Sequence, residues 1–121
     1  MKRKISILFD KEVNMCSIYF RELLDNPIDP KTQIERNIIN LEKYDSSEDV
    51  DCGDFSIILD INEGGYISAV ELYDAKKRLH EILEETVYNT VIETGSTILL
   101  EDPSEILTRL HIKEDISMYK I

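Results

Sequence analysis

The chain has no tryptophan, four glycines, three prolines, two cysteines and two histidines among its 121 residues. Two cysteines, Cys16 and Cys52, are too few for a disulfide framework or for a zinc site with four thiolate ligands, so a reducing compartment is expected. Only 7% of the residues are aromatic, so the 42% that are hydrophobic must form a core mainly of isoleucine, leucine and valine. A chain of this length and composition is expected to fold as a single domain over residues 1–121.

Basic residues are also scarce, because 14 Lys and Arg stand against 25 Asp and Glu, which gives a formal net charge of -11. This charge opposes contact with a phosphate backbone, so we expect a basic protein partner and no direct binding of nucleic acid. Residues 42–71 alone hold nine acidic residues and one basic residue, and they account for most of the excess. The acidity is therefore concentrated in one part of the chain.

Long hydrophobic runs are missing as well. The basic start followed by residues 5–9 resembles the beginning of a signal peptide, but Asp10 ends the hydrophobic run too early. No other segment is hydrophobic over the length that crosses a membrane. We expect a cytoplasmic protein without membrane contact.

Alternating hydrophobic residues predict two β-hairpins. The first spans residues 4–20, and it places on one face Ile5, Ile7, Phe9, Cys16, Ile18 and Phe20. In the second, over Phe55–Tyr73, an even-numbered loop at Gly64 and Gly65 sets Leu59 opposite Val70 and Ile57 opposite Leu72. A loop of three residues would turn one hydrophobic face over, because strand side chains alternate with period two. We therefore expect a loop of two or four residues.

The remaining segments predict helices and one strand. A helix is expected from Asp74 to about Ile92, although the β-branched residues after Glu85 also suit a strand. A short strand over residues 96–100 and a helix capped by Asp102 follow. Residues 30–42 suit a helix or an edge strand, and residues 45–54 a loop. The fold class is α+β, an antiparallel β-meander packed by C-terminal helices, with hairpins and the helix start in 4–80 and a helical extension in 81–121.

Residues 58–79 combine an apolar strand, an acidic glycine turn, a second strand and the run Ala-Lys-Lys-Arg-Leu. This segment resembles the second half of a small prokaryotic domain of unknown function, family twenty-two eighty-three. Residues 9–20 are similar to that family's opening, an aromatic-Asp pair before a strand, so the resemblance covers roughly residues 4–80. It implies an antiparallel meander with a following helix and no activity, and family members look like accessory or antitoxin-type proteins beside small toxins. The chain departs from the family in a longer segment between Phe20 and Phe55 and in the residues after Leu79.

Residues 60–71 also fit the twelve-residue calcium loop of an EF-hand. The ligands of this alternative are Asp60, Asn62, Tyr66, Ser68 and Glu71, with Gly65 at the sharp turn. Gly64 leaves one ligand position without a side chain, the preceding residues are poor helix formers, and no second loop is present to pair with the first. The hairpin explains the segment better, with Asp60 and Glu71 as solvated strand carboxylates.

No catalytic constellation is recognisable. His80 and His111 lack the neighbours of a metalloprotease motif, and neither cysteine is placed as a nucleophile. We therefore expect no enzymatic activity and no cofactor, and we predict a non-enzymatic acidic inhibitor of the antitoxin, immunity or phage anti-defence type that engages a basic, nucleic-acid-handling partner. The contact residues expected for it are Glu48, Asp49, Asp51, Asp54, Asp60, Glu63 and Glu71.

Two alternatives stay open for the same surface. The acidic segment could serve only as a solvated stretch that aids solubility. An exposed hairpin edge would also allow a homodimer, or pairing with a strand of a partner.

Overall fold

The computed structural model describes residues 2–20, 44–62, 64–113 and 115–121, so the prediction for residues 30–42 lies outside the described part. Its elements follow in the order β1 (Arg3–Asp10), β2 (Met15–Tyr19), β3 (Tyr44–Asp51), β4 (Ser56–Asn62), β5 (Ile67–Tyr73), α2 (Ala75–Ile82), α3 (Glu85–Thr94), β6 (Ser96–Glu101) and α4 (Pro103–Arg109). The predicted α+β class is confirmed.

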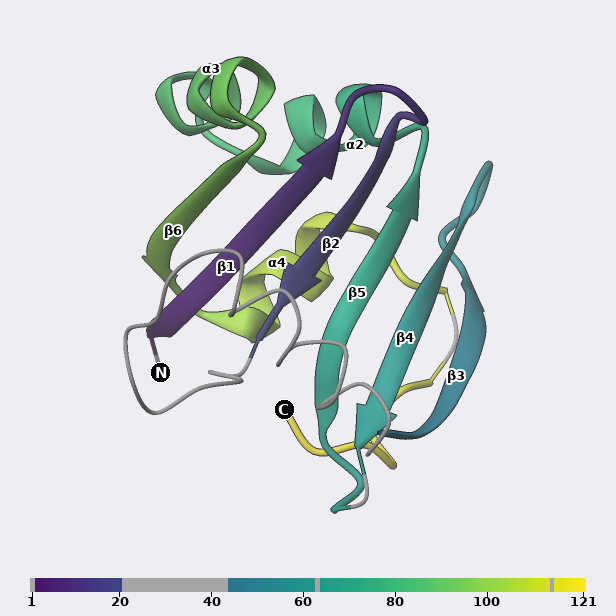
Figure 1. Ribbon diagram of the computed structural model, residues 1–121. Coiled ribbons are helices and arrows are strands. Elements are labelled where there is room, and N and C mark those ends of the chain that lie inside the picture. The colour runs from purple at the N-terminus through teal and green to yellow at the C-terminus, as the bar shows by residue number, and fades with distance from the viewer. Residues whose placement is uncertain (1, 21–43, 63, 114) are drawn as a thin grey trace.

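The described strands form one antiparallel sheet in the order β3-β4-β5-β2-β1-β6 (Figure 1). Strands β3, β4 and β5 follow one another as a meander, and the β1–β2 hairpin joins them because β2 pairs with β5. The first predicted hairpin is confirmed, and its six inward residues are buried. Strands β3 and β6 form the two edges of the sheet.

One face of the sheet carries the hydrophobic core. Helix α4 lies behind the sheet in Figure 1, and α2 and α3 cross its upper end. The helices contribute to the core Ala75, Leu79, Ile82, Val91, Ile106, Leu107 and Leu110. No described helix lies on the other face, which we call the open face. The cross-strand pairing assigns to it Ser47, Asp49, Ile58, Asp60, Ala69, Glu71, Ser17, Tyr19, Ser6, Leu8, Ser96 and Ile98.

The prediction of a loop over residues 45–54 is wrong, because most of this segment is edge strand β3. Pairing with β4 satisfies its backbone groups, and the side chains of Val50 and Cys52 point into the core. These two buried residues, two positions apart, give the segment one hydrophobic face despite its charges. The acidic side chains are therefore held on a strand and the turn that follows it.

The prediction of one helix to Ile92 is also wrong. Helix α2 ends at Ile82, Leu83 is extended (φ -109°, ψ 151°), and α3 begins at Glu85. Gly95 closes α3 in the left-handed region (φ 85°) and donates its N–H to the carbonyl of Val91 at 2.8 Å. The predicted strand after Gly95 is confirmed as β6, and the Asp102 carboxylate caps α4 by accepting the N–H of Ser104 at 2.9 Å.

The β4–β5 hairpin has the predicted register, with Ile57 opposite Leu72 and Leu59 opposite Val70. The even-numbered loop is wrong, because the Asn62 N–H donates to the Tyr66 carbonyl at 2.9 Å, across an odd number of residues. A register shift after Asp60 compensates for the odd loop by leaving Ser68 as an extra residue in β5. This bulge keeps the hydrophobic residues of both strands on the core face. The sequence argument expected that only an even-numbered loop could do so.

Candidate functional site

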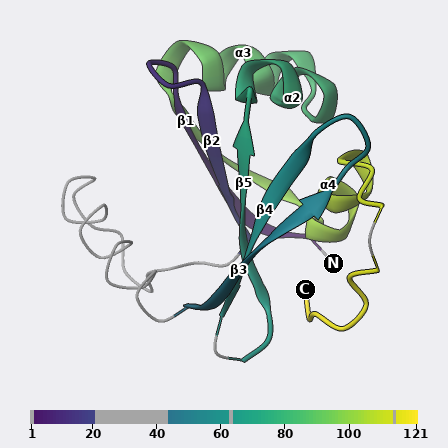
Figure 2. The ribbon, with the colours of Figure 1, turned by 90° about the vertical axis from the view of Figure 1, so that its right-hand side faces the viewer.

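Most of the exposed acidic residues predicted as contacts lie on one sheet edge, which we call the acidic hairpin (residues 47–60). Figure 2 shows this edge, with β3 and β4 toward the viewer. The side chains of Glu48, Asp49, Asp51 and Asp54 are all exposed. The turn is closed by Cys52, whose N–H donates to the Phe55 carbonyl at 2.9 Å. Predicted contact Glu63 lies outside the described residues.

The four exposed carboxylates point in different directions. Asp49 and Asp51 lie on the open face, whereas Glu48 lies on the core side of β3 and accepts a hydrogen bond from the Tyr119 hydroxyl. The Asp51 carboxylate accepts the N–H of Gly53 at 2.8 Å, which fixes the start of the turn, and Asp54 lies within the turn. The acidic hairpin therefore carries negative charge on both faces of this sheet edge and in the turn.

None of these four carboxylates forms an ion pair with a lysine or arginine of the described chain. The ion pairs found in the described residues belong instead to Arg78 and Arg109. Glu48 and Asp51 accept hydrogen bonds, and the Lys113 side chain lies beside Gly53, but no ion pair among the described residues neutralises the four exposed carboxylates, so an external basic side chain can pair with them.

The acidic hairpin is attached firmly to the core. The guanidinium of Arg78 on α2 stacks over the ring of Phe55 at 3.7 Å from its centroid, and Arg78 is only 7% exposed. Its NH1 also lies 3.8 Å from a Glu81 carboxylate oxygen, and its Nε has no described hydrogen-bond partner. Together with the buried side chains of Val50 and Cys52, this stacking holds the carboxylates in a fixed arrangement.

Asp60 and Glu71 form a carboxyl pair on the open face. Asp60 lies opposite Ser47 and Ala69, and Glu71 lies opposite Ile58, so the two carboxyls are diagonal neighbours on β4 and β5. Asp60 is only 4% exposed, and it accepts a hydrogen bond from the Ser47 hydroxyl at 2.7 Å. The prediction that both are solvated is wrong for Asp60, because β3 supplies a neighbour that a loop would not have placed there.

The pair holds a proton more tightly than an ordinary carboxyl does. Burial, followed by the charge of Asp60 and a hydrogen bond with it, raises the pKa of Glu71 to about 7. Burial also raises the pKa of the neighbouring Tyr19 hydroxyl, a hydrogen bond with Ser17 lowers it, and the two carboxyls add to the rise. Glu71 therefore binds a proton more tightly than a solvated carboxyl does, and the pair does not form two free anionic contacts.

The EF-hand alternative is contradicted by the secondary structure, because strands and not helices flank residues 60–71. Its predicted ligand groups are also engaged within the hairpin. The Asn62 side-chain oxygen accepts the N–H groups of Gly64 and Tyr66, both at 3.0 Å, and the Ser68 hydroxyl donates to the Asp60 carbonyl at 3.0 Å. Within the described ranges, no cluster of three or more His, Cys, Asp or Glu side chains is placed to hold a metal ion.

The other residues considered for reactivity, two cysteines and a histidine, are buried or packed against a neighbouring side chain. Cys16 is buried as predicted, and burial raises the pKa of its thiol to about 12. Cys52 is buried too, which corrects its expected place in an exposed loop. His80 is exposed, and its ring meets that of Tyr88 edge-on, with the centroids 4.9 Å apart.

Sequence reasoning missed the Asp60–Glu71 pair and the contact between Arg78 and Phe55. The hairpin register contained a signal for the first, because setting Leu59 opposite Val70 also makes Asp60 and Glu71 diagonal neighbours. No local signal indicated the second, since Arg78 belongs to the basic run Lys76–Arg78 and Phe55 lies far from it in sequence.

Comparisons with protein-family models, curated proteins and solved structures found no match to this chain. The resemblance over residues 4–80 stays a prediction. None of the described helices has the length and apolar character needed to cross a membrane.

Proposed function

We propose that this protein is a non-enzymatic inhibitor that uses the acidic hairpin to bind a basic protein. The observation that supports this most directly is the set of exposed carboxylates on one sheet edge, Glu48, Asp49, Asp51 and Asp54, without ion-pair partners among the described residues. A partner with a lysine- and arginine-rich surface, such as a toxin nuclease or a nucleic-acid-handling defence protein, has the matching charge. This is the chemistry of an antitoxin, an immunity protein or a phage anti-defence protein acting in the cytoplasm.

The rigidity of the acidic hairpin favours this function over simple solubilisation. A solvated acidic loop would have to be ordered on binding, at a cost in conformational entropy. Here β3 pairs along its length with β4, and the turn is anchored through Phe55 and Arg78. Asp49 and Asp51 stand on the same side of the strand, about 7 Å apart along it, which is the repeat of two residues in a strand.

Burial and hydrogen bonding support a smaller contact set, among the described residues, than the one that the sequence suggested. Asp60 is buried and hydrogen-bonded to Ser47, and Glu71 is hydrogen-bonded to Asp60. Both carboxyls are therefore less accessible to a partner than the exposed carboxylate of Asp49. The Asp60–Glu71 pair lies beside Asp49 on the open face and positions the strands that carry it. The proposed contact residues are therefore Glu48, Asp49, Asp51 and Asp54.

The test compares two variants that each remove three negative charges. In Asp49→Asn/Asp51→Asn/Asp54→Asn the charge is lost from the acidic hairpin, while the asparagine oxygen at position 51 can still accept the Gly53 N–H. The matched control neutralises three exposed glutamates elsewhere, Glu12, Glu84 and Glu93. The immobilised wild-type chain is used to capture partners from cell lysate at low salt, and the captured protein is then identified and purified.

Calorimetry with that purified protein decides the proposal. We expect the control variant to bind as the wild type does and the hairpin variant to bind at least about tenfold more weakly, as for close charge pairs in interfaces. Equal affinity of the hairpin variant and the control would show that the acidic hairpin is not the binding surface. Unchanged urea midpoints for both variants would show that the fold is intact.

A further inference from the structure

The outer edge of β6 has backbone hydrogen-bonding groups without partners. The Phe9 N–H donates to the Gly95 carbonyl at 2.7 Å, and hydrogen bonding alternates along an antiparallel ladder. The backbone groups of Ser96, Ile98 and Leu100 therefore point away from β1. Those of Ser96 lie beside the Thr94 hydroxyl, which accepts from the Ser96 N–H at 3.4 Å and can donate its one hydrogen either to the Ser96 carbonyl at 2.8 Å or to the Thr90 carbonyl at 2.7 Å.

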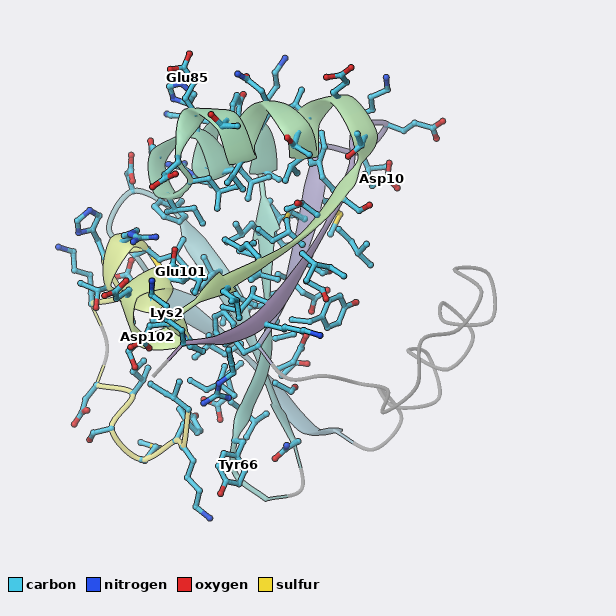
Figure 3. All side chains as sticks on the ribbon, turned by 90° about the vertical axis from the view of Figure 1, so that its left-hand side faces the viewer. Lys2, Asp10, Tyr66, Glu85, Glu101 and Asp102 are labelled. Carbon is cyan, nitrogen blue, oxygen red and sulfur yellow. The ribbon has the colours of Figure 1, made fainter. Side chains whose placement is uncertain are left out.

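The next two outward positions are open. In the described part of the chain, no hydrogen bond reaches the outward N–H and C=O groups of Ile98 and Leu100. Figure 3 views the molecule from this side, and no described element lies over the strand, whose lower end is marked by Glu101 and Asp102. Each chain thus offers two N–H donors and two carbonyl acceptors at this edge.

The side chains at this edge are hydrophobic. Ile98 and Leu100 are each 66% exposed, and Leu8 on β1 is exposed beside them on the open face. An exposed, uncharged edge strand can form backbone hydrogen bonds with a strand of another chain. Proteins usually prevent this with charged residues on the edge or with a helix or loop that covers it. No charged residue lies between Ser96 and Leu100.

The opposite edge shows the contrast. Strand β3 carries three charged residues among its exposed positions, and the Lys113 N–H covers its end by donating to the Asp51 carbonyl at 2.8 Å. Charged side chains and a backbone hydrogen bond protect the β3 edge, whereas the described residues give the β6 edge no such protection. We therefore take β6 as the edge available for pairing.

A second copy of the same strand complements this edge. In an antiparallel pair with its two-fold axis beside Leu99, Ile98 of each copy lies opposite Leu100 of the other. This register uses all the open N–H and C=O groups and brings the exposed isoleucine and leucine side chains of both copies together. A register centred on Ile98 would place Leu100 opposite Ser96, whose backbone groups already lie within hydrogen-bond distance of the Thr94 hydroxyl.

Charge does not oppose this pairing, although the chain carries a net charge of -11. The acidic hairpin is at the far edge of the sheet, so in the pair the two acidic hairpins point away from each other. Near the contact, Glu101 lies opposite Arg3 on β1 and forms an ion pair with Arg109, with 3.4 Å between the closest atoms. Among the described residues, the negative charge closest to the two-fold axis is thus compensated within each copy.

We propose that two copies of this chain associate through β6 into a dimer with one continuous antiparallel sheet. The contact is one strand pair with two exposed hydrophobic side chains from each copy, which is at the small end for a specific interface. The dimer is therefore expected to form reversibly, with a dissociation constant in the micromolar range. It would present an acidic hairpin at each end, but it does not depend on what those hairpins bind.

Sedimentation velocity over a range of protein concentrations tests the proposal with two variants. Ile98→Lys introduces a charge at the edge, and because the side chain is mostly exposed, the fold should tolerate it. Val13→Lys is the matched control, since Val13 is also an exposed hydrophobic residue but lies in the β1–β2 turn. We expect the wild type and the control to dimerise alike and Ile98→Lys to weaken dimerisation at least about tenfold.

Hydrogen exchange supplies a readout that does not depend on a variant. Between dilute and concentrated wild-type protein, the amides of Ile98 and Leu100 should gain protection, while the outward amides of β3 should not. A chain that stays monomeric up to millimolar concentration would overturn the proposal. So would dimerisation that Ile98→Lys leaves unchanged, or a monomer whose β6 amides gain protection only when a different protein is added.

Discussion

Replacement of Glu71 by glutamine should remove a pH-dependent loss of stability between about pH 4 and about pH 8. In the folded protein the pKa of Glu71 is raised to about 7 from its ordinary value of 4.5. The folded state therefore holds this proton more tightly than the unfolded chain does. The stabilisation is complete below the unfolded pKa and is lost as the pH rises through 7. Glutamine does not titrate and can still donate a hydrogen bond to Asp60.

The size of the effect follows from the pKa difference. The full difference would correspond to about 3 kcal/mol, and because Glu71 is only partly buried, solvent screening reduces this to about 1 to 2 kcal/mol. At about pH 8, Glu71→Gln should thus be more stable than the wild type by about 1 to 2 kcal/mol, and near pH 4 the two should be similar.

Urea unfolding at several pH values measures this difference. Glu93→Gln serves as the control, since it makes the same substitution at an exposed position on α3, away from the Asp60–Glu71 pair. A second variant, Asp60→Asn, removes the neighbouring charge and should flatten the pH dependence in part. The reasoning would be refuted by a free-energy difference between Glu71→Gln and the wild type that stays constant across the pH range.

Three further predictions test the hairpin and its attachments. Calcium added up to millimolar concentration should give no binding heat and no change in melting temperature, because the side chains of Asp60–Glu71 are engaged within the hairpin; a saturable heat would contradict this. Arg78→Ala should lower the unfolding free energy by about 1 to 2 kcal/mol through loss of its stacking on Phe55, whereas exposed Lys77→Ala should change it by less than about 0.5 kcal/mol; equal effects in urea unfolding would show that the stacking contributes nothing. Gly95→Ala should cost about 1 to 2 kcal/mol because the left-handed backbone at the end of α3 strains an alanine, and an unchanged thermal midpoint would refute that strain.

The hairpins could be predicted because their hydrophobic residues alternate without interruption. Ile57 and Leu59 on one strand and Val70 and Leu72 on the other allow few registers that keep one face hydrophobic, and the structure has the expected one. The bulge at Ser68 could not be predicted, since an even loop and an odd loop with one extra residue give the same hydrophobic pattern.

Strand β3 was missed because charged and small polar residues have low strand propensity. Only two alternating buried residues mark the segment, Val50 in β3 and Cys52 directly after it, and two are too few to stand out in an acidic segment. That error also explains the wrong environment for Asp60, since Ser47 reaches Asp60 only when β3 pairs with β4. The burial of a carboxylate here depends on a neighbour distant in sequence.

The break between α2 and α3 had no local signal. Leu83 and Glu84 are good helix formers without glycine or proline nearby, yet Leu83 is extended. Tertiary packing overrides propensity, because the turn allows Leu79 and Ile82 on α2 and Val91 on α3 to be buried in the same core. The capping of α4 by Asp102 was predictable, because its signal lies entirely within a few adjacent residues.

The salt dependence of affinity for the captured basic partner tests the central claim most directly. Dissociation constants measured from about 50 mM to about 500 mM salt should rise steeply for the wild type, as expected for contacts between exposed charges. The variant that lacks the carboxylates of Asp49, Asp51 and Asp54 should bind more weakly and with a clearly shallower slope. The same slope for this variant and the wild type would contradict recognition through the acidic hairpin.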